Sequence, residues 1–175
     1  MLREAYPEMA VIGVEPVGSI AFGGPGGPYY QSGTGTPPGA ELGALVSYDL
    51  IDSGRKVSDR AAFATARVLA RRTGLLVGGS AGGVIHQALG ELARDAAAST
   101  MVALVCDAGE KYLDSVFDDD WMRERELLDP EAEAELDELL AEIAGTAPQR
   151  LHGPPRARAS PAGAVRQAGA SSVAT

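Results

Sequence analysis

The sequence predicts an α/β protein with a mainly parallel sheet and flanking helices. Two short apolar runs, residues 10–15 and 101–106, are rich in the aliphatic and β-branched side chains of buried strands. Between them, apolar side chains recur with helical spacing in two longer segments. Strands that alternate with helices are typical of a parallel sheet, because a crossover between parallel strands needs room for a helix.

The first part of the chain is predicted to hold two strands joined by a long loop. Residues 10–15 form a β-branched run bounded by Pro7 and Pro16. Residues 18–43 are rich in glycine and proline and have no apolar periodicity, so we expect a loop there. It is either a flexible surface loop or a substrate-side loop whose glycines admit close backbone approach. A short strand is predicted at residues 45–48.

Two amphipathic helices follow, separated by a glycine-rich turn. The first opens at Ser58 or Asp59, either of which can cap it, and ends at Gly74. A short strand and a loop, residues 74–81, lead into the second helix, residues 82–97. The arginines of the first helix are expected to form a solvated face: Arg60, Arg67, Arg71 and Arg72.

The remaining elements are a strand, two helices and a tail. Residues 101–106 are expected to be covered on both faces, so Cys106 is interpreted as a small buried hydrophobe. The aspartates 118–120 are interpreted as solvated residues that open a helix, since adjacent side chains diverge and lack metal-loop spacing. An acidic helix, residues 129–144, carries a narrow leucine stripe that packs on this domain or on a partner. The tail, residues 145–175, is predicted to be disordered.

Composition and charge argue against several classes of function and location. The 175 residues carry a net charge of −9, which argues against a nucleic-acid or anionic-membrane surface. One cysteine gives neither a disulfide framework nor a zinc pattern. No apolar run is long enough to span a bilayer, and the N-terminus lacks the apolar core of a signal peptide. We therefore expect a soluble, cytoplasmic protein.

The glycine-rich turn also fits the nucleophile elbow of α/β-hydrolases. Residues 78–82 match G-x-S-x-G between a strand and a helix, with Ser80 at the nucleophile position. Asp107 and His152 follow in the hydrolase order. However, nothing in the tail is expected to hold His152 against Ser80, and His86, further along the helix, is interpreted as a structural or partly exposed residue. A serine hydrolase is therefore the weaker alternative.

Four motifs occur in register over most of the chain. They are residues 11–19, Gly33-Thr34-Gly35, residues 74–83, and residues 107–113 with 118–122. Together they resemble the C-terminal part of the cysteine synthase and cystathionine β-synthase family, which are pyridoxal-phosphate enzymes of fold type II. Residues 17–24 are particularly similar to the branch that makes diaminopropionate precursors. The resemblance implies a partial fold-type II enzyme domain over residues 1–128.

The resemblance implies β-replacement on an activated serine, with pyridoxal 5′-phosphate as the electron sink. It also implies a set of cofactor-pocket residues: Gly33, Thr34 and Gly35 at the active-site mouth, Gly79 and Ser80 in the helix-opening loop beneath the cofactor, and Asp107 and Ala108 at its pyridine edge. Ala108 stands where many relatives have a serine, whose hydroxyl alanine cannot replace. No catalytic or metal-binding residue is assigned.

The family's Schiff-base lysine belongs to its N-terminal portion, and no segment of this sequence matches that portion. Lys56 is expected in a polar turn, and Lys111 matches a basic residue of no such role. We therefore expect a C-terminal fragment or half of a split enzyme, inactive alone, that does not hold the cofactor covalently. Its expected partners are an N-terminal half, a full-length relative or a second copy. An interaction module that completes a partner subunit is the alternative.

Overall fold

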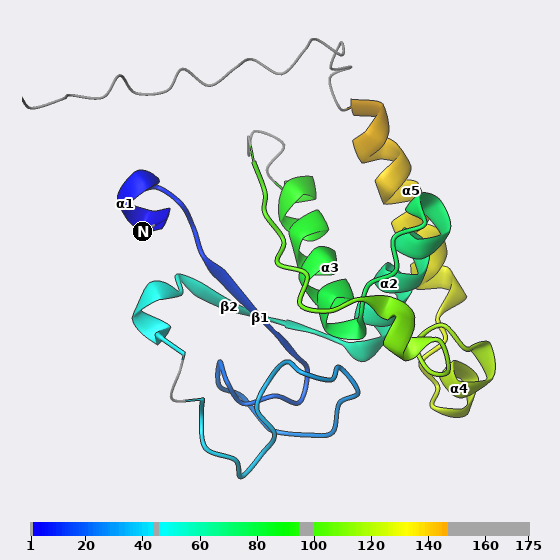
Figure 1. The fold of residues 1–175 in the computed structure, drawn as a ribbon, viewed down its shortest axis with the longest axis horizontal. Coiled ribbons are helices and arrows are strands. Elements are labelled where there is room, and N and C mark those ends of the chain that lie inside the picture. The colour runs from blue at the N-terminus through cyan, green and yellow to red at the C-terminus, as the bar shows by residue number, and fades with distance from the viewer. Residues whose placement is uncertain (1, 44–45, 95–99, 147–175) are drawn as a thin grey trace, which may run out of the picture.

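The computed structural model describes residues 2–43, 46–94 and 100–146. Its regular elements are α1 (Leu2–Ala5), β1 (Ile12–Pro16), the 3₁₀ turn η1 (Tyr48–Leu50), β2 (Ser53–Val57), α2 (Asp59–Thr73), α3 (Gly79–Arg94), the 3₁₀ turn η2 (Gly109–Tyr112), α4 (Asp119–Glu124) and α5 (Pro130–Thr146). Helices α2 and α3 pack against each other beside the two strands, and α5 packs on α2 (Figure 1). The predicted α/β class, with a parallel sheet and flanking helices, is confirmed.

The two strands pair in parallel, and one of them was not foreseen from the sequence. Strand β1 lies where the β-branched run predicts it. Strand β2 escaped prediction because Ser-Gly-Arg-Lys has no apolar alternation. Lys56, expected in a polar turn, therefore lies in a strand and pairs with Glu15 of β1. The strand predicted at residues 45–48 is wrong, because Tyr48 begins η1 and Val46 belongs to no strand; residues 44–45 lie outside the described ranges.

Helix α2 begins and ends as predicted. The Ser58 side chain accepts a hydrogen bond from the Ala61 amide at 3.2 Å, which caps the N-terminus. Gly74 ends the helix in the left-handed region, at φ 74°. Helix α3 begins at Gly79, earlier than the predicted residue 82, because the Gly82 amide already bonds to the Gly78 carbonyl. Its predicted end at residue 97 lies outside the described residues.

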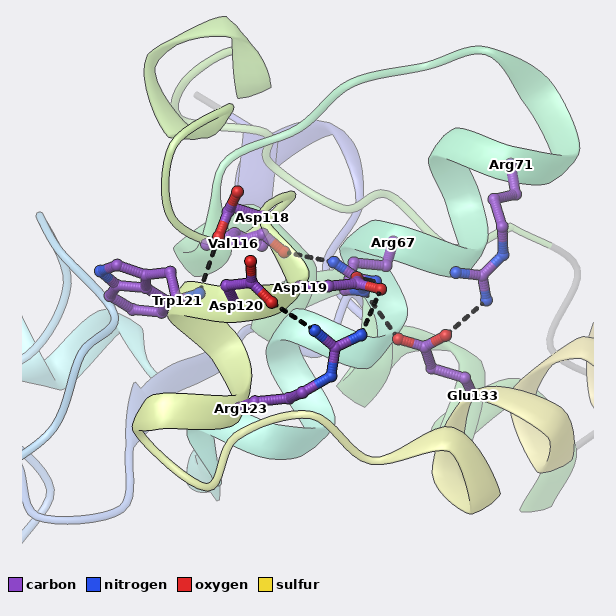
Figure 2. Close-up of polar contacts among 9 residues, drawn as sticks. All are labelled: Arg67, Arg71, Val116, Asp118, Asp119, Asp120, Trp121, Arg123 and Glu133. Atoms are coloured by element: carbon purple, nitrogen blue, oxygen red, sulfur yellow. Dashed lines mark hydrogen bonds and ion pairs between the residues drawn. The ribbon is translucent and has the colours of Figure 1, made fainter.

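The arginines of α2 that were predicted to form a solvated face are exposed at three positions, Arg60, Arg71 and Arg72. Arg67 is the exception and corrects the prediction. The Arg67 side chain is only 11% exposed, and it binds Asp119 of α4, Glu133 of α5 and the Val116 carbonyl (Figure 2). Burial alone would lower the pKa of Arg67, but its hydrogen bonds to these two carboxylates raise it. Arg67 therefore ties α4 and α5 to α2.

Helix α5 packs on this domain, which decides between the two places predicted for its leucine stripe. Leu136 is buried with Val68 of α2 and Leu89 of α3. Of the aspartates at 118–120, Asp118 caps α4 by accepting a hydrogen bond from the Trp121 amide at 2.7 Å. The helix-opening role predicted for this run is thus confirmed. Nothing is described of the tail from residue 147 onward, where the predicted disorder and His152 lie.

The segment at residues 101–106 corrects the prediction of a strand buried on both faces. It forms no strand, and the side chains of Val102 and Leu104 are 84% and 77% exposed. Cys106, expected to be buried, is exposed. The composition of residues 101–106 is typical of a strand that pairs with a neighbour on each side. The described residues provide no such neighbour, so the segment stays exposed. The strand predicted at residues 74–77 is reduced to a single antiparallel bridge between Val77 and Ala108.

Candidate functional site

The loop that opens α3 is packed so tightly against α2 that it tolerates only glycine at two positions. A Cβ atom at Gly79 would lie 2.4 Å from Cε1 of Phe63, and one at Gly82 would lie 2.2 Å from the Ala62 carbonyl oxygen. Ser80 between them is 4% exposed. The glycines therefore let the two helices approach closely, and the first turn of α3 is held rigidly by the core.

Asp107 lies directly against this loop. The Gly78 amide donates to the Asp107 carbonyl at 3.2 Å, and the Gly109 amide donates to the Leu76 carbonyl at 3.1 Å. A Cβ atom at Gly78 would lie 2.0 Å from Oδ1 of Asp107. The predicted residues Gly79, Ser80, Asp107 and Ala108 thus meet at one place, with Ala108 exposed beside it.

The two oxygens of the Asp107 carboxylate have different environments. Oδ2 accepts a hydrogen bond from the Tyr112 hydroxyl at 2.6 Å. Oδ1 is buried and has no hydrogen-bond partner within the described part of the chain. A buried oxygen without a donor is costly, so this atom marks a position where a bound group can donate.

Tyr112 completes the polar cluster around Asp107. Its hydrogen bond to Asp107 and its burial raise the pKa of the Tyr112 hydroxyl, while an interaction with the Ser32 side chain opposes that shift. Ser32 immediately precedes Gly33, so this contact brings the glycine-rich loop to the Asp107 end of the site. Tyr112 lies within one of the sequence motifs, but no role was predicted for it, because only the fold places its hydroxyl at the carboxylate.

The Gly33-Thr34-Gly35 loop reaches the same region through Gln31. Gln31 is 1% exposed, and its side-chain amide donates to the Val57 carbonyl at 3.0 Å. A Cβ atom at Gly83 of α3 would lie 2.5 Å from Oε1 of Gln31. Gly33 and Gly35 have φ angles of 79° and 85°, which glycine adopts without strain. All seven predicted pocket residues therefore lie on three neighbouring segments.

The hydrolase constellation is not assembled by the residues that are described. His86 Nδ1 lies 3.1 Å from the Thr65 hydroxyl of α2, and burial lowers the pKa of the imidazole. This engagement fits the structural role predicted for His86. His152, the other candidate base for Ser80, lies outside the described residues.

Residues 2–43, 46–94 and 100–146 contain neither a metal-binding cluster nor a membrane-spanning helix. No group of three histidine, cysteine, aspartate or glutamate side chains there could hold a metal ion. None of the helices in these ranges is both long and apolar enough to cross a bilayer.

Comparison with known proteins decides the family. The model of the pyridoxal-phosphate-dependent enzyme family matches residues 1–107. The chain belongs to this family. A protein of Sinorhizobium fredii, provisionally named a cysteine synthase, is 54% identical over 136 residues, which cover 78% of this chain and 40% of that protein. N-(2-amino-2-carboxyethyl)-L-glutamate synthase of Ralstonia nicotianae is 38% identical and covers 69% of this chain and 35% of its own length.

Solved structures of this pyridoxal-phosphate family share the fold of this chain. The O-acetylserine-dependent cystathionine β-synthase of Helicobacter pylori superposes with a TM-score of 0.59 at 35% identity, over 65% of this chain and 36% of that one. Cysteine synthase of Entamoeba histolytica superposes with a TM-score of 0.64 at 25% identity, over 80% of this chain and 39% of that one. The resemblance to cysteine synthase-like enzymes of fold type II is confirmed, and the chain spans about two fifths of these relatives.

The residues present fit pyridoxal phosphate, the cofactor of the family. The unpartnered Oδ1 of Asp107 offers an acceptor, and the absence of a side chain at Gly78 leaves room for this carboxylate against the turn. The Ser80 hydroxyl stands in the same turn and can donate or accept. These groups form one wall of a site.

Proposed function

We propose that this chain is part of a pyridoxal-phosphate-dependent synthase that performs β-replacement on an activated serine in amino-acid biosynthesis. The observation that carries the proposal is the meeting of the Gly78–Ser80 turn with the buried, unpartnered Oδ1 of Asp107. Family membership supports the cofactor, and the names of the relatives support the reaction class.

The roles of the chain's own residues follow from this wall. When bound, the cofactor supplies the electron sink for exchange at the β-carbon. Asp107 accepts a hydrogen bond from the bound group, and Tyr112 holds the carboxylate in place by donating to its other oxygen. Ser80 orients the ring from the rigid first turn of α3. The Gly33-Thr34-Gly35 loop allows close backbone approach at the mouth and excludes water there.

We further propose that the chain acts only together with a second polypeptide segment that supplies the remaining walls and the lysine. Lys56 forms an ion pair with Glu15, and Lys111 lies exposed in η2. Neither lysine is therefore placed to bind the cofactor covalently. The exposed apolar residues Val102 and Leu104 are the surface expected to receive that segment.

A shallow groove beside the 101–106 segment supports the assignment of this surface as the docking site. Its lining includes Ile12 and Val14 of β1, Val84 and Ala88 of α3, and Met101 with Val102. An extended apolar segment next to such a groove is suited to strand addition by the missing part of the domain. A second copy of the chain or a full-length relative could occupy the same surface, which is the interaction-module alternative.

The experiment mixes this chain with a polypeptide that covers the part of the Sinorhizobium relative outside the match. β-Replacement is followed as consumption of O-acetylserine with sulfide or an amine nucleophile. Activity is expected in the mixture and in neither component alone. Asp107→Asn is expected to reduce it, whereas Lys111→Met, at an exposed position, is the matched control. Activity of the isolated chain would overturn the proposed need for a second segment, and a folded mixture without activity would overturn the reaction.

A further inference from the structure

An ion pair between the two strands stands outside the site described above. Glu15 of β1 is 1% exposed, and its Oε1 accepts a hydrogen bond from Nζ of Lys56 in β2 at 2.5 Å. The Phe22 amide donates to the same oxygen at 3.1 Å. Lys56 is only partly buried, with 30% of its side chain exposed. The pair therefore lies at the edge of the sheet where β1 runs into the long loop.

Lys56 also holds the loop itself. Its ammonium donates a second hydrogen bond, of 2.5 Å, to the Ser19 carbonyl. Ser19 is fully buried, and its hydroxyl accepts hydrogen bonds from the Thr36 amide at 2.8 Å and the Ala21 amide at 3.3 Å. The Ile20 amide donates to the Thr36 carbonyl at 2.9 Å, which closes the base of the loop.

The Gly33-Thr34-Gly35 loop is thereby seated directly on Ser19. A Cβ atom at Gly35 would lie 2.8 Å from both Cβ and Oγ of Ser19 and 2.8 Å from Cδ of Pro16. Gly35 has a φ of 85°, so a side chain there would be strained as well as crowded. A continuous set of contacts thus runs from Glu15 through Lys56 and Ser19 to the loop.

The charge state of Glu15 is consistent with this arrangement. Burial alone would raise the pKa of Glu15, but hydrogen bonds from Lys56, Ser19 and the Phe22 amide hold it below its ordinary value. The charged group that faces Glu15 is Lys56, and the other two partners are neutral. Glu15 is therefore ionised at neutral pH and needs its counter-ion.

We propose that Lys56 is a positioning residue for the Gly33-Thr34-Gly35 loop and acts through Ser19. Lys56 bridges an acceptor on β1 and an acceptor in the loop, so it fixes the loop relative to the strand. The statement that this loop borders the cofactor pocket rests on the proposed function. The anchoring itself does not, and it is measured separately.

The test is amide hydrogen exchange at Thr36 in the full chain, followed by NMR. In Lys56→Met, exchange of the Thr36 amide is expected to become about tenfold faster, since a local opening is made easier. Amides inside α2, such as that of Ala66, are expected to keep their rates. Lys56→Arg retains a donor and is expected to restore part of the protection. Lys111→Met, which removes the other lysine of the chain, is the matched control and is expected to change nothing.

Two further measurements test the anchoring of the loop by Lys56. If Lys56→Met does not fold, the double variant Glu15→Gln with Lys56→Met removes the unpaired buried charge and is tested instead. In the native chain, the Thr36 amide signal is expected to shift as the pH falls below about 4.3, the ordinary pKa of glutamate, and Glu15→Gln is expected to abolish that shift. Unchanged Thr36 exchange in a folded Lys56 variant would overturn the proposal.

The loop's function is tested apart from its anchoring, with the chain mixed with the complementary segment. There, Lys56→Met is expected to raise KM for the amino-acid substrate more than it lowers kcat. If the loop of Lys56→Met exchanges faster but KM is unchanged, the anchoring role of Lys56 is supported. The same result would contradict the loop's proposed place at the active-site mouth.

Discussion

The apolar side chains on the helical side of the molecule and those of the segment at residues 101–106 lie in opposite environments. Phe63 of α2 is 1% exposed and contacts the first turn of α3, whereas Leu104 is 77% exposed. Helix α2 buries its apolar face against α3 and α5, which this chain itself provides. The 101–106 segment has the composition of a central strand but no neighbouring strand in the described ranges. The comparison separates a buried core on the helical side from a segment that, within the described ranges, is exposed and pairs with no strand.

The position of the candidate site explains why this difference matters for function. The Gly78–Ser80 turn belongs to the helical side and is rigid, while Asp107 follows directly after the exposed segment. The wall of the proposed pocket thus lies where the two regions meet. We expect substitutions on the helical side to act mainly on stability and substitutions in the exposed segment to act mainly on association.

The largest effect on stability is expected for Phe63→Ala. Truncation of a fully buried aromatic side chain removes about 3–5 kcal/mol from the free energy of unfolding. Urea denaturation of the full chain measures it, with Leu104→Ala as the matched control. The control is expected to change the unfolding free energy by less than about 0.5 kcal/mol, as for exposed sites in general. Equal losses at both positions would contradict the contrast between the regions.

A smaller loss is expected for Arg67→Met, which leaves the partly buried carboxylate of Glu133 with Arg71 as its ion-pair partner. We expect a loss of about 2 kcal/mol, less than the 3–5 kcal/mol of fully buried pairs because the site is partly exposed. Arg123→Met removes only exposed ion pairs and is expected to change stability little.

The Arg67 effect is also expected to depend on pH in a defined direction. The hydrogen bond and charge of Arg67 lower the pKa of Asp119, so their contribution is present at neutral pH. It is lost as the pH falls through the lowered pKa of Asp119 in the folded chain. Native and Arg67→Met chains are therefore expected to converge in stability in acid, and a constant difference down to low pH would contradict this assignment.

In the exposed segment, Leu104→Lys is expected to leave the stability of the isolated chain nearly unchanged. A lysine at a site that is 77% exposed desolvates nothing in the chain alone. In the mixture with the complementary segment, it would be buried, so we expect at least about a tenfold weaker association, the equivalent of 1.4 kcal/mol. Isothermal titration calorimetry measures the association, and unchanged affinity would place the contact elsewhere.

The smallest effect is expected at the polar cluster where the two regions meet. Asp107→Asn removes the carboxylate whose hydrogen bond and charge raise the pKa of the Tyr112 hydroxyl. Tyr112 is therefore expected to ionise at a lower pH in the variant, closer to the ordinary value of about 10. Ultraviolet difference titration follows this group, and Tyr112→Phe identifies its signal. An unchanged titration would show that Asp107 does not control the hydroxyl.

The elements with complete local signals were predictable from the sequence. Helix α2 has a serine cap, a periodic apolar face and a terminal glycine, and each of these is local. Strand β2 could not be predicted, because its pairing with β1 depends on residues distant in the chain and not on its own composition. Conversely, residues 101–106 have the composition of a buried strand. Such a strand needs neighbouring strands, and the described residues provide none beside this segment.

The candidate site was predictable in its segments and not in its contacts. The family resemblance implied that the Gly78–Ser80 turn and Asp107 share one wall of a pocket, and backbone hydrogen bonds join these two segments. The roles of Tyr112 and Lys56 were missed, because both depend on partners that only the fold brings near. Glu15 belongs to the motif at residues 11–19. Its burial could not be predicted, because no local signal distinguishes a buried strand glutamate from an exposed one.

The most direct test of the account is cofactor retention during gel filtration. The isolated chain is incubated with pyridoxal phosphate, treated with borohydride and chromatographed, and the same is done after mixing with the complementary segment. The account predicts that cofactor absorbance elutes with the mixture and is absent from the isolated chain. Absorbance that elutes with the isolated chain, with the cofactor's mass added at Lys56 or Lys111, would contradict the claim that this chain supplies only one wall of the pocket.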